Sequence, residues 1–140
     1  MMGMAKAMEI AYEDMENHRQ HVEKLKLHMI ERLKSSIEGV QFNGVSDDLD
    51  NSLYTVISVC LPPNEDNDML LFNMDIDGIS VSGGSACSSG SSIGSHVLAE
   101  LDRDASRGAI RFSFSKFNTE NEVNYVVDKL AALYAGQLAI

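Results

Sequence analysis

The spacing of apolar positions near the start of the chain predicts one long helix over residues 4–37. Bulky side chains recur at steps of three and four, which places them on one stripe of a helix. This stripe consists of Met4, Met8, Ala11, Met15, His18, Val22, Leu25, Met29, Leu33 and Ile37. A helix of this length is about 45 Å long, whereas a globule of this size is under about 40 Å across. We therefore expect its first half to project from its domain and to need a partner surface.

Shorter elements follow the helix in a mixed order of strands and helices. The predicted segments are strands at 40–43, 53–61, 79–81 and 109–114, and helices at 69–77, 95–101 and after Thr119. Pro62-Pro63 is expected to end the second strand, and Thr119 with Glu122 forms a capping box for the last helix. The sequence therefore predicts an α+β fold, in which a long N-terminal helix and further helices pack on a small, mainly antiparallel sheet.

Composition and charge restrict the possible classes of function. The 140 residues have a formal net charge of −10 and are 44% hydrophobic, as expected for one domain with a real core. Nucleic-acid binding is disfavoured because phosphate contacts need clustered Lys and Arg. No apolar run approaches the roughly 20 residues of a membrane span, and no signal peptide is recognisable. We therefore expect a cytoplasmic protein that binds neither nucleic acid nor membranes.

Cys87 lies in a segment of unusual composition. Residues 82–92 contain six serines and three glycines and no hydrophobic anchor. A structural cysteine usually has apolar neighbours, and an exposed thiol is a liability unless the protein uses it. Cys87 is therefore a candidate nucleophile on a loop that moves between two positions. An incidental cysteine in a solvent-exposed Gly/Ser linker fits the composition equally well.

Three other residues could take part in chemistry. Arg111 is expected on a largely buried strand, where a charge must either pair with an acidic residue of the protein or bind an anion such as a carboxylate. His96 could act as a base for Cys87, although a solvent-exposed helix residue is the simpler interpretation. Cys60 is expected to be a small buried side chain. Cys87 and His96 match no common zinc spacing, so we expect no metal site.

The order of these motifs resembles a known family. Residues 79–90, Ile-Ser-Val-Ser-Gly-Gly-Ser-Ala-Cys-Ser-Ser-Gly, and then residues 95–98 resemble the active-site loop of NifS-like and IscS-like cysteine desulfurases. Residues 109–114 and 117–123 resemble the next landmark of that family, and the start of the chain resembles its long inter-domain helix. The resemblance runs in order over nearly the whole chain, and the block around Cys87 is its most specific part.

The resemblance implies a class V aminotransferase fold and a reaction that depends on pyridoxal phosphate. It implies that L-cysteine is the substrate, that alanine is released, and that Cys87 carries the sulfur as a persulfide. An acceptor protein would then receive the sulfur for iron–sulfur clusters or thiolated molecules. By the same resemblance, Arg111 grips the substrate carboxylate and the enzyme is a homodimer. His96 matches a common residue of the family, and we assign it no chemical role.

One part of the family pattern has no counterpart in this sequence. The family's cofactor lysine sits in a large domain, and no lysine here stands in a similar setting: Lys6, Lys24, Lys26, Lys34, Lys116 and Lys129. Gly94 also stands where the family often has proline. We therefore expect residues 1–140 to form the C-terminal small domain without the large domain that binds pyridoxal phosphate. Within it, residues 1–38 are expected to be the inter-domain helix and residues 82–92 the catalytic-cysteine loop.

By itself such a chain is expected to be inactive. Two other functions stay open. One is a related lyase that acts on selenocysteine or cysteine sulfinate, which the cysteine-bearing loop disfavours. The other is a stand-alone module that carries a persulfide or binds a partner without catalysis.

Overall fold

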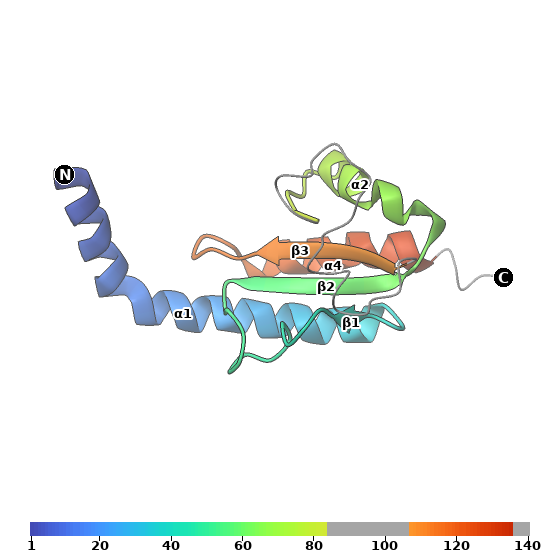
Figure 1. Cartoon of the computed structure of the whole chain (residues 1–140), viewed down its shortest axis with the longest axis horizontal. Helices are drawn as coiled ribbons and strands as arrows, with labels where there is room; N and C mark the ends of the chain where they lie inside the picture. The colour runs from blue at the N-terminus through green and yellow to red at the C-terminus, as the bar shows by residue number, and fades with distance from the viewer. Residues whose placement is uncertain (84–106, 136–140) are drawn as a thin grey trace.

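Helix α1, Met2–Ser36, begins the chain in the computed structural model, which describes residues 1–83 and 107–135. The predicted long helix is confirmed. Only its second half is buried, at Val22, Leu25, Lys26, Met29, Ile30 and Leu33. Its N-terminal turns extend beyond the end of the sheet, and the helix bends where it leaves the body of the molecule (Figure 1). None of the helices in the described ranges is long and apolar enough to cross a membrane.

The sheet has three strands in the order β1-β2-β3, and both pairings are antiparallel. Strand β1 is Gln41–Phe42, β2 is Val56–Pro63 and β3 is Arg107–Ser113. Strand β2 is the central strand because its neighbours pair with both of its edges. The predicted α+β fold with an antiparallel sheet is therefore confirmed.

Three helical segments complete the described fold. The 3-10 helix η1 is Glu65–Met69, and α2 is Leu70–Ile76. The last helix, α4, is Glu120–Ala135. Helix α4 lies beside the second half of α1, and Arg32 of α1 pairs with Asp128 of α4 at 2.7 Å. The two helices and the sheet enclose one hydrophobic core, to which α2 also contributes.

Strand β3 shows why the alternation in the sequence was informative. Ile110 and Phe112 are buried, while Arg111 and Ser113 between and beyond them are exposed. Successive side chains of a strand point to opposite faces of the sheet. Full burial of one such side chain contributes about 1.5–3 kcal/mol, so the alternation fixes which face of β3 packs on the core.

The limits of the three observed strands differ from the predicted ones by one to three residues, and the fourth predicted strand is absent. Strand β2 begins at Val56 rather than Leu53, and it continues through Pro62-Pro63. Proline is tolerated there because it lies at the strand end, beyond an irregularity in the pairing between Cys60 and Pro63. Residues 79–81 form no strand; the segment that follows them pairs with β3 at an isolated bridge between Ser82 and Arg111. The predicted helix at 95–101 lies outside the described residues.

Candidate functional site

Arg111 lies at the middle of β3, where the chain segment that leads towards Cys87 meets the sheet. The backbone N–H of Ser82 donates to the carbonyl of Arg111 at 3.1 Å, and the N–H of Arg111 donates to the carbonyl of Ser82 at 2.6 Å. On its other side, Arg111 stands opposite Ser58 of β2. The strand order therefore places Arg111 between the central strand and the segment that precedes residue 84.

The side chain of Arg111 also engages Ser82. Its Nε donates a hydrogen bond to Ser82 Oγ at 3.0 Å. The expectation that Arg111 is buried was wrong, because Arg111 is on the exposed face of β3. Within residues 1–83 and 107–135, no carboxylate forms an ion pair with its guanidinium. An anchored guanidinium without an acidic partner in this part of the chain is suited to bind an external anion.

The backbone at Gly83 packs closely against its surroundings. A side-chain Cβ at this position would lie 3.0 Å from the carbonyl oxygen of Ala109 and 3.1 Å from Cδ1 of Leu71. These contacts come from β3 and from α2, so the segment is held between two elements. Glycine permits this approach because it has no Cβ. The path of the chain at Ser82 is therefore well defined.

The remaining predicted site residues divide into two groups. Cys87 and His96 lie outside the described residues, and their roles stay predictions. Cys60 is buried, as predicted, and its Sγ accepts a hydrogen bond from Arg107 Nε at 3.2 Å. Arg107 also donates to the carbonyl of Gly39. Cys60 and Arg107 thus join β2, β3 and the turn after α1, which is a structural arrangement.

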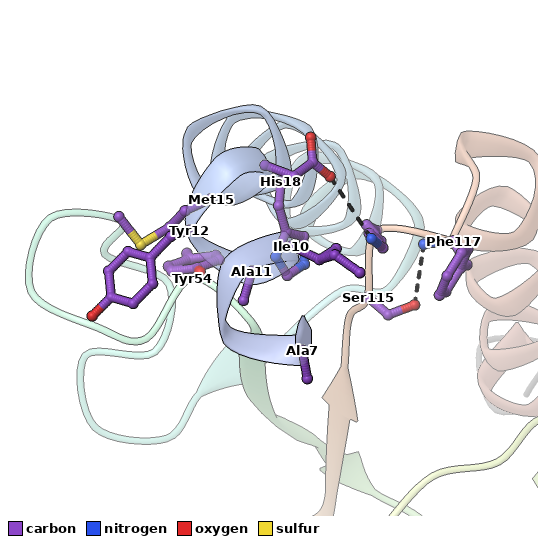
Figure 2. Close-up of a pocket in the computed structure, with 11 residues that line it drawn as sticks. Ala7, Ile10, Ala11, Tyr12, Met15, His18, Tyr54, Ser115 and Phe117 are labelled. Atoms are coloured by element: carbon purple, nitrogen blue, oxygen red, sulfur yellow. Dashed lines mark hydrogen bonds and ion pairs between the residues drawn. The ribbon is translucent and has the colours of Figure 1, made fainter. Parts of the chain in front are cut away.

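A hollow lies beside the projecting half of α1 (Figure 2). It has a volume of about 760 Å³. Most of its lining is apolar, and the side chains come from α1, from Tyr54 and from the turn after β3: Ala7, Ile10, Ala11, Tyr12, Asp14, Met15, His18, Tyr54, Ser115, Lys116 and Phe117. His18 Nε2 is buried there with no hydrogen-bond partner in the described part of the chain. Lys116 lies 3.8 Å from Asp14.

No lysine of the chain is placed to hold a cofactor covalently. Lys26 is fully buried, but its Nζ donates to Ser52 Oγ at 2.7 Å and to the carbonyl of Leu53 at 2.9 Å. Burial lowers the pKa of Lys26 below its usual 10.5. Lys116 lines the hollow beside α1 together with Asp14, whose carboxylate would repel a phosphate. The other four lysines, Lys6, Lys24, Lys34 and Lys129, are exposed or half-exposed. All of them except Lys24 pair with a carboxylate among the described residues.

Two roles were missed by reasoning from the sequence. Ser82 appears there only as the first serine of a Gly/Ser-rich segment, and its partner Arg111 is 29 positions away. The only signal was that it follows Val81 directly before the glycines. The burial of Lys26 was missed because a lysine in an amphipathic helix is normally assigned to the solvated face.

Comparisons with known proteins converge on one family. The aminotransferase class V family model matches residues 1–126. Cysteine desulfurase IscS of Pseudoalteromonas translucida is 34% identical over 130 residues, which are 91% of this chain and 31% of that protein. Cysteine desulfurase IscS of Dictyoglomus turgidum is 31% identical over 133 residues, which are 93% of this chain and 32% of that protein.

Solved structures show the same fold. A NifS-like protein superposes with a TM-score of 0.71 at 32% identity, covering 94% of this chain and 32% of the other. A NifS-like protein from Rickettsia africae superposes with a TM-score of 0.67 at 20% identity and supports the fold. The chain thus spans about a third of the length of the curated relatives that it matches.

Proposed function

Because the chain belongs to the aminotransferase class V family, we propose that it supplies the substrate-carboxylate and sulfur-accepting groups of an L-cysteine desulfurase. The observation that carries the proposal is the Arg111 guanidinium, which is exposed, has no acidic partner in the described part of the chain and is anchored to Ser82. Ser82 begins the segment that contains Cys87. The names of the relatives support the reaction, since they are cysteine desulfurases.

Arg111 has the chemistry that this role requires. A guanidinium is planar, permanently charged and matched in shape to a carboxylate, which it can bind through two parallel hydrogen bonds. In the proposed enzyme it holds the carboxylate of L-cysteine. Its side chain can point only outward from the sheet, because the neighbouring Ile110 and Phe112 fill the core face of β3.

Cys87 is the proposed sulfur acceptor. Its thiolate is the nucleophile, and it attacks the sulfur of L-cysteine. A sulfur–sulfur bond forms as the carbon–sulfur bond of the substrate breaks, and the carbon takes up a proton. The products are L-alanine and a persulfide on Cys87, so no external oxidant or reductant is needed.

The cofactor of the proposed enzyme is pyridoxal phosphate, which supports bond cleavage at amino acids. The lysines of this chain do not fit this cofactor. Lys26 is buried and donates its hydrogen bonds to Ser52 and Leu53. Lys116 shares its hollow with the carboxylate of Asp14, which would repel the phosphate. We therefore assign the cofactor to a large domain outside this chain, with residues 1–140 acting as the small domain. The share of the relatives that the chain spans, about a third, supports this division. By itself the chain would be inactive.

The proposal extends to the setting of the enzyme. It would work as a homodimer in the cytoplasm and pass its persulfide sulfur to an acceptor protein for iron–sulfur cluster assembly or thiolation. The resemblance of residues 79–90 to the cysteine-bearing loop of desulfurases supports this extension.

A chimera tests the role of Cys87. This chain would replace the matched third of the Pseudoalteromonas translucida relative, and absorbance of bound pyridoxal phosphate would confirm assembly. With L-cysteine, we expect alanine release and a mass gain of one sulfur atom on Cys87. Cys87→Ala should reduce turnover by about 100-fold or more while the cofactor stays bound.

Cys60→Ala is the matched control, because Cys60 is the other cysteine and is buried. It should keep its turnover. A cofactor-loaded chimera in which Cys87→Ala turns over at the unaltered rate would refute the proposed role of Cys87.

A further inference from the structure

The Ser82 hydroxyl contacts the guanidinium of Arg111 at Nε, the nitrogen next to the aliphatic part of the side chain. Arg111 Nε donates to Ser82 Oγ at 3.0 Å, and the backbones of the same two residues exchange two hydrogen bonds. Three hydrogen bonds thus join Ser82 and Arg111. Gly83 packs against Ala109 and Leu71 directly afterwards. The hydroxyl is therefore fixed in space relative to the arginine backbone.

This contact selects one edge of the guanidinium for a ligand. A carboxylate can bind either the Nε edge or the edge formed by the two Nη groups. Because Ser82 Oγ occupies Nε, the edge with both Nη groups is left for an anion. None of the described residues forms an ion pair there.

Without this contact Arg111 would be a long, exposed side chain on a strand. Such side chains have many rotamers, and this conformational entropy is lost when a ligand orders them. A hydrogen bond from the charged Nε to a fixed hydroxyl removes part of this cost before the substrate arrives.

We propose that Ser82 is the positioning residue of Arg111: its hydroxyl holds the guanidinium so that both Nη groups face the substrate carboxylate. This inference rests on the proposed function, in which Arg111 binds the carboxylate of L-cysteine. Ser82 touches no reacting atom; it acts through Arg111.

Two isosteric variants separate the hydroxyl from the shape of the side chain. Ser82→Thr keeps the hydroxyl and adds a methyl group, and Ser82→Val has the shape of threonine without the hydroxyl. Ser113→Ala is the matched control, since Ser113 is an exposed serine on β3, the strand that carries Arg111. Its hydroxyl forms no hydrogen bond with any of residues 1–83 and 107–135.

The first measurement uses the chain alone and reports on the hydrogen bond. The Nε–H resonance of Arg111 would be assigned by its loss in Arg111→Lys, and its exchange with water measured by NMR. We expect protected exchange in the unaltered chain, in Ser82→Thr and in Ser113→Ala, and exchange at least about 10-fold faster in Ser82→Val. Equal exchange in Ser82→Val and the unaltered chain would overturn the inference.

The second measurement uses the cofactor-loaded chimera and reports on positioning. In Ser82→Val, the KM for L-cysteine should rise about 10-fold, as expected for a hydrogen bond to a charged group, while kcat stays nearly constant. Ser82→Thr should restore the KM. If Ser82 had only a structural role, Ser82→Val would lower the amount of folded enzyme. The KM of the folded enzyme would then be the same in the unaltered chimera, in Ser82→Val and in Ser82→Thr.

Arg111→Lys distinguishes this inference from the proposed function. If Arg111→Lys leaves the KM unchanged, Arg111 does not bind the carboxylate and the proposed function of Arg111 fails. If Arg111→Lys raises the KM but Ser82→Val does not, the function of Arg111 stands and the role of Ser82 is refuted.

Discussion

At the scale of single residues, the fold gives two cationic side chains opposite surroundings. Arg111 is exposed on β3, and its side chain is held by Ser82 through Nε without an acidic partner among the described residues, so its charge is available to a ligand. Lys26 is fully buried, and its charge is used within the protein by Ser52 and Leu53. Ser52 in turn donates to the carbonyl of Asp48. Lys26 therefore ties α1 to the loop before β2.

The burial of Lys26 predicts a pH dependence of stability. Burial lowers the pKa of Lys26 in the folded chain below 10.5, so the folded state releases this proton more readily than the unfolded state. The contribution of Lys26 to the free energy of unfolding is therefore fully present above pH 10.5 and is lost as the pH falls through the lowered pKa. Urea unfolding at a series of pH values between 7 and 10.5 would measure it.

Replacement of Lys26 isolates this contribution. Lys26→Met should remove the rise in the free energy of unfolding with pH that Lys26 causes. Lys24→Met is the control, because Lys24 is exposed on the same helix, and it should leave that rise unchanged. Identical pH profiles for the unaltered chain and Lys26→Met would contradict the prediction.

At the scale of elements, the ends of helices follow local chemistry. The predicted capping box of α4 is confirmed: the N–H of Thr119 donates to Glu122 Oε2 at 2.9 Å, and the N–H of Glu122 donates to Thr119 Oγ1 at 3.3 Å. The hydrogen bond from the Thr119 N–H, together with one from the Asn118 side chain, lowers the pKa of the Glu122 carboxyl. Gly78, with a φ of 74°, follows α2 and supplies the left-handed residue that often ends a helix.

The capping box should contribute measurably to stability. Thr119→Ala removes the hydroxyl that caps α4 and should lower the free energy of unfolding by about 1 kcal/mol. Asn121→Ala is the matched control, since Asn121 is exposed two residues further along the same helix and should change it by less than about 0.5 kcal/mol. Chemical unfolding monitored by circular dichroism would decide, and equal losses in the two variants would count against the capping role.

At the scale of the whole molecule, the core and the projecting helix behave differently. The second half of α1 packs with the sheet and α4 into one core. The first half exposes Met4, Met8 and Met15, and the hollow of about 760 Å³ lies beside it. Exposed apolar side chains gathered on one face often mark an interaction site. The expectation that the first half of the helix projects from its domain is confirmed.

The projecting face should bind a hydrophobic dye. We expect the folded chain to enhance the fluorescence of 8-anilinonaphthalene-1-sulfonate, because such dyes bind exposed apolar surface. Met8→Gln with Met15→Gln should reduce the enhancement at least about twofold without changing the unfolding transition, since both residues are exposed. Leu27→Gln, on the exposed side of the packed half of α1, is the control. An equal reduction in that control would contradict the assignment of the dye site.

The sequence by itself determined the features that depend on neighbouring residues. The helical period of α1, the alternation of Ile110 and Phe112, and the capping of α4 all arise from contacts within a few positions, and periodicity reports such contacts. The position of Cys87 in a desulfurase-like loop was also visible in the sequence, as a resemblance.

Only the tertiary structure decided which distant residues meet. The order of strands brings Ser82 to Arg111 across 29 positions, and the packing of the loop before β2 buries Lys26. No local pattern encodes either contact, because each depends on how separate elements share one core. The sequence indicated an arginine that needs a partner; the fold exposed it on β3 and placed the Ser82 hydroxyl against its Nε.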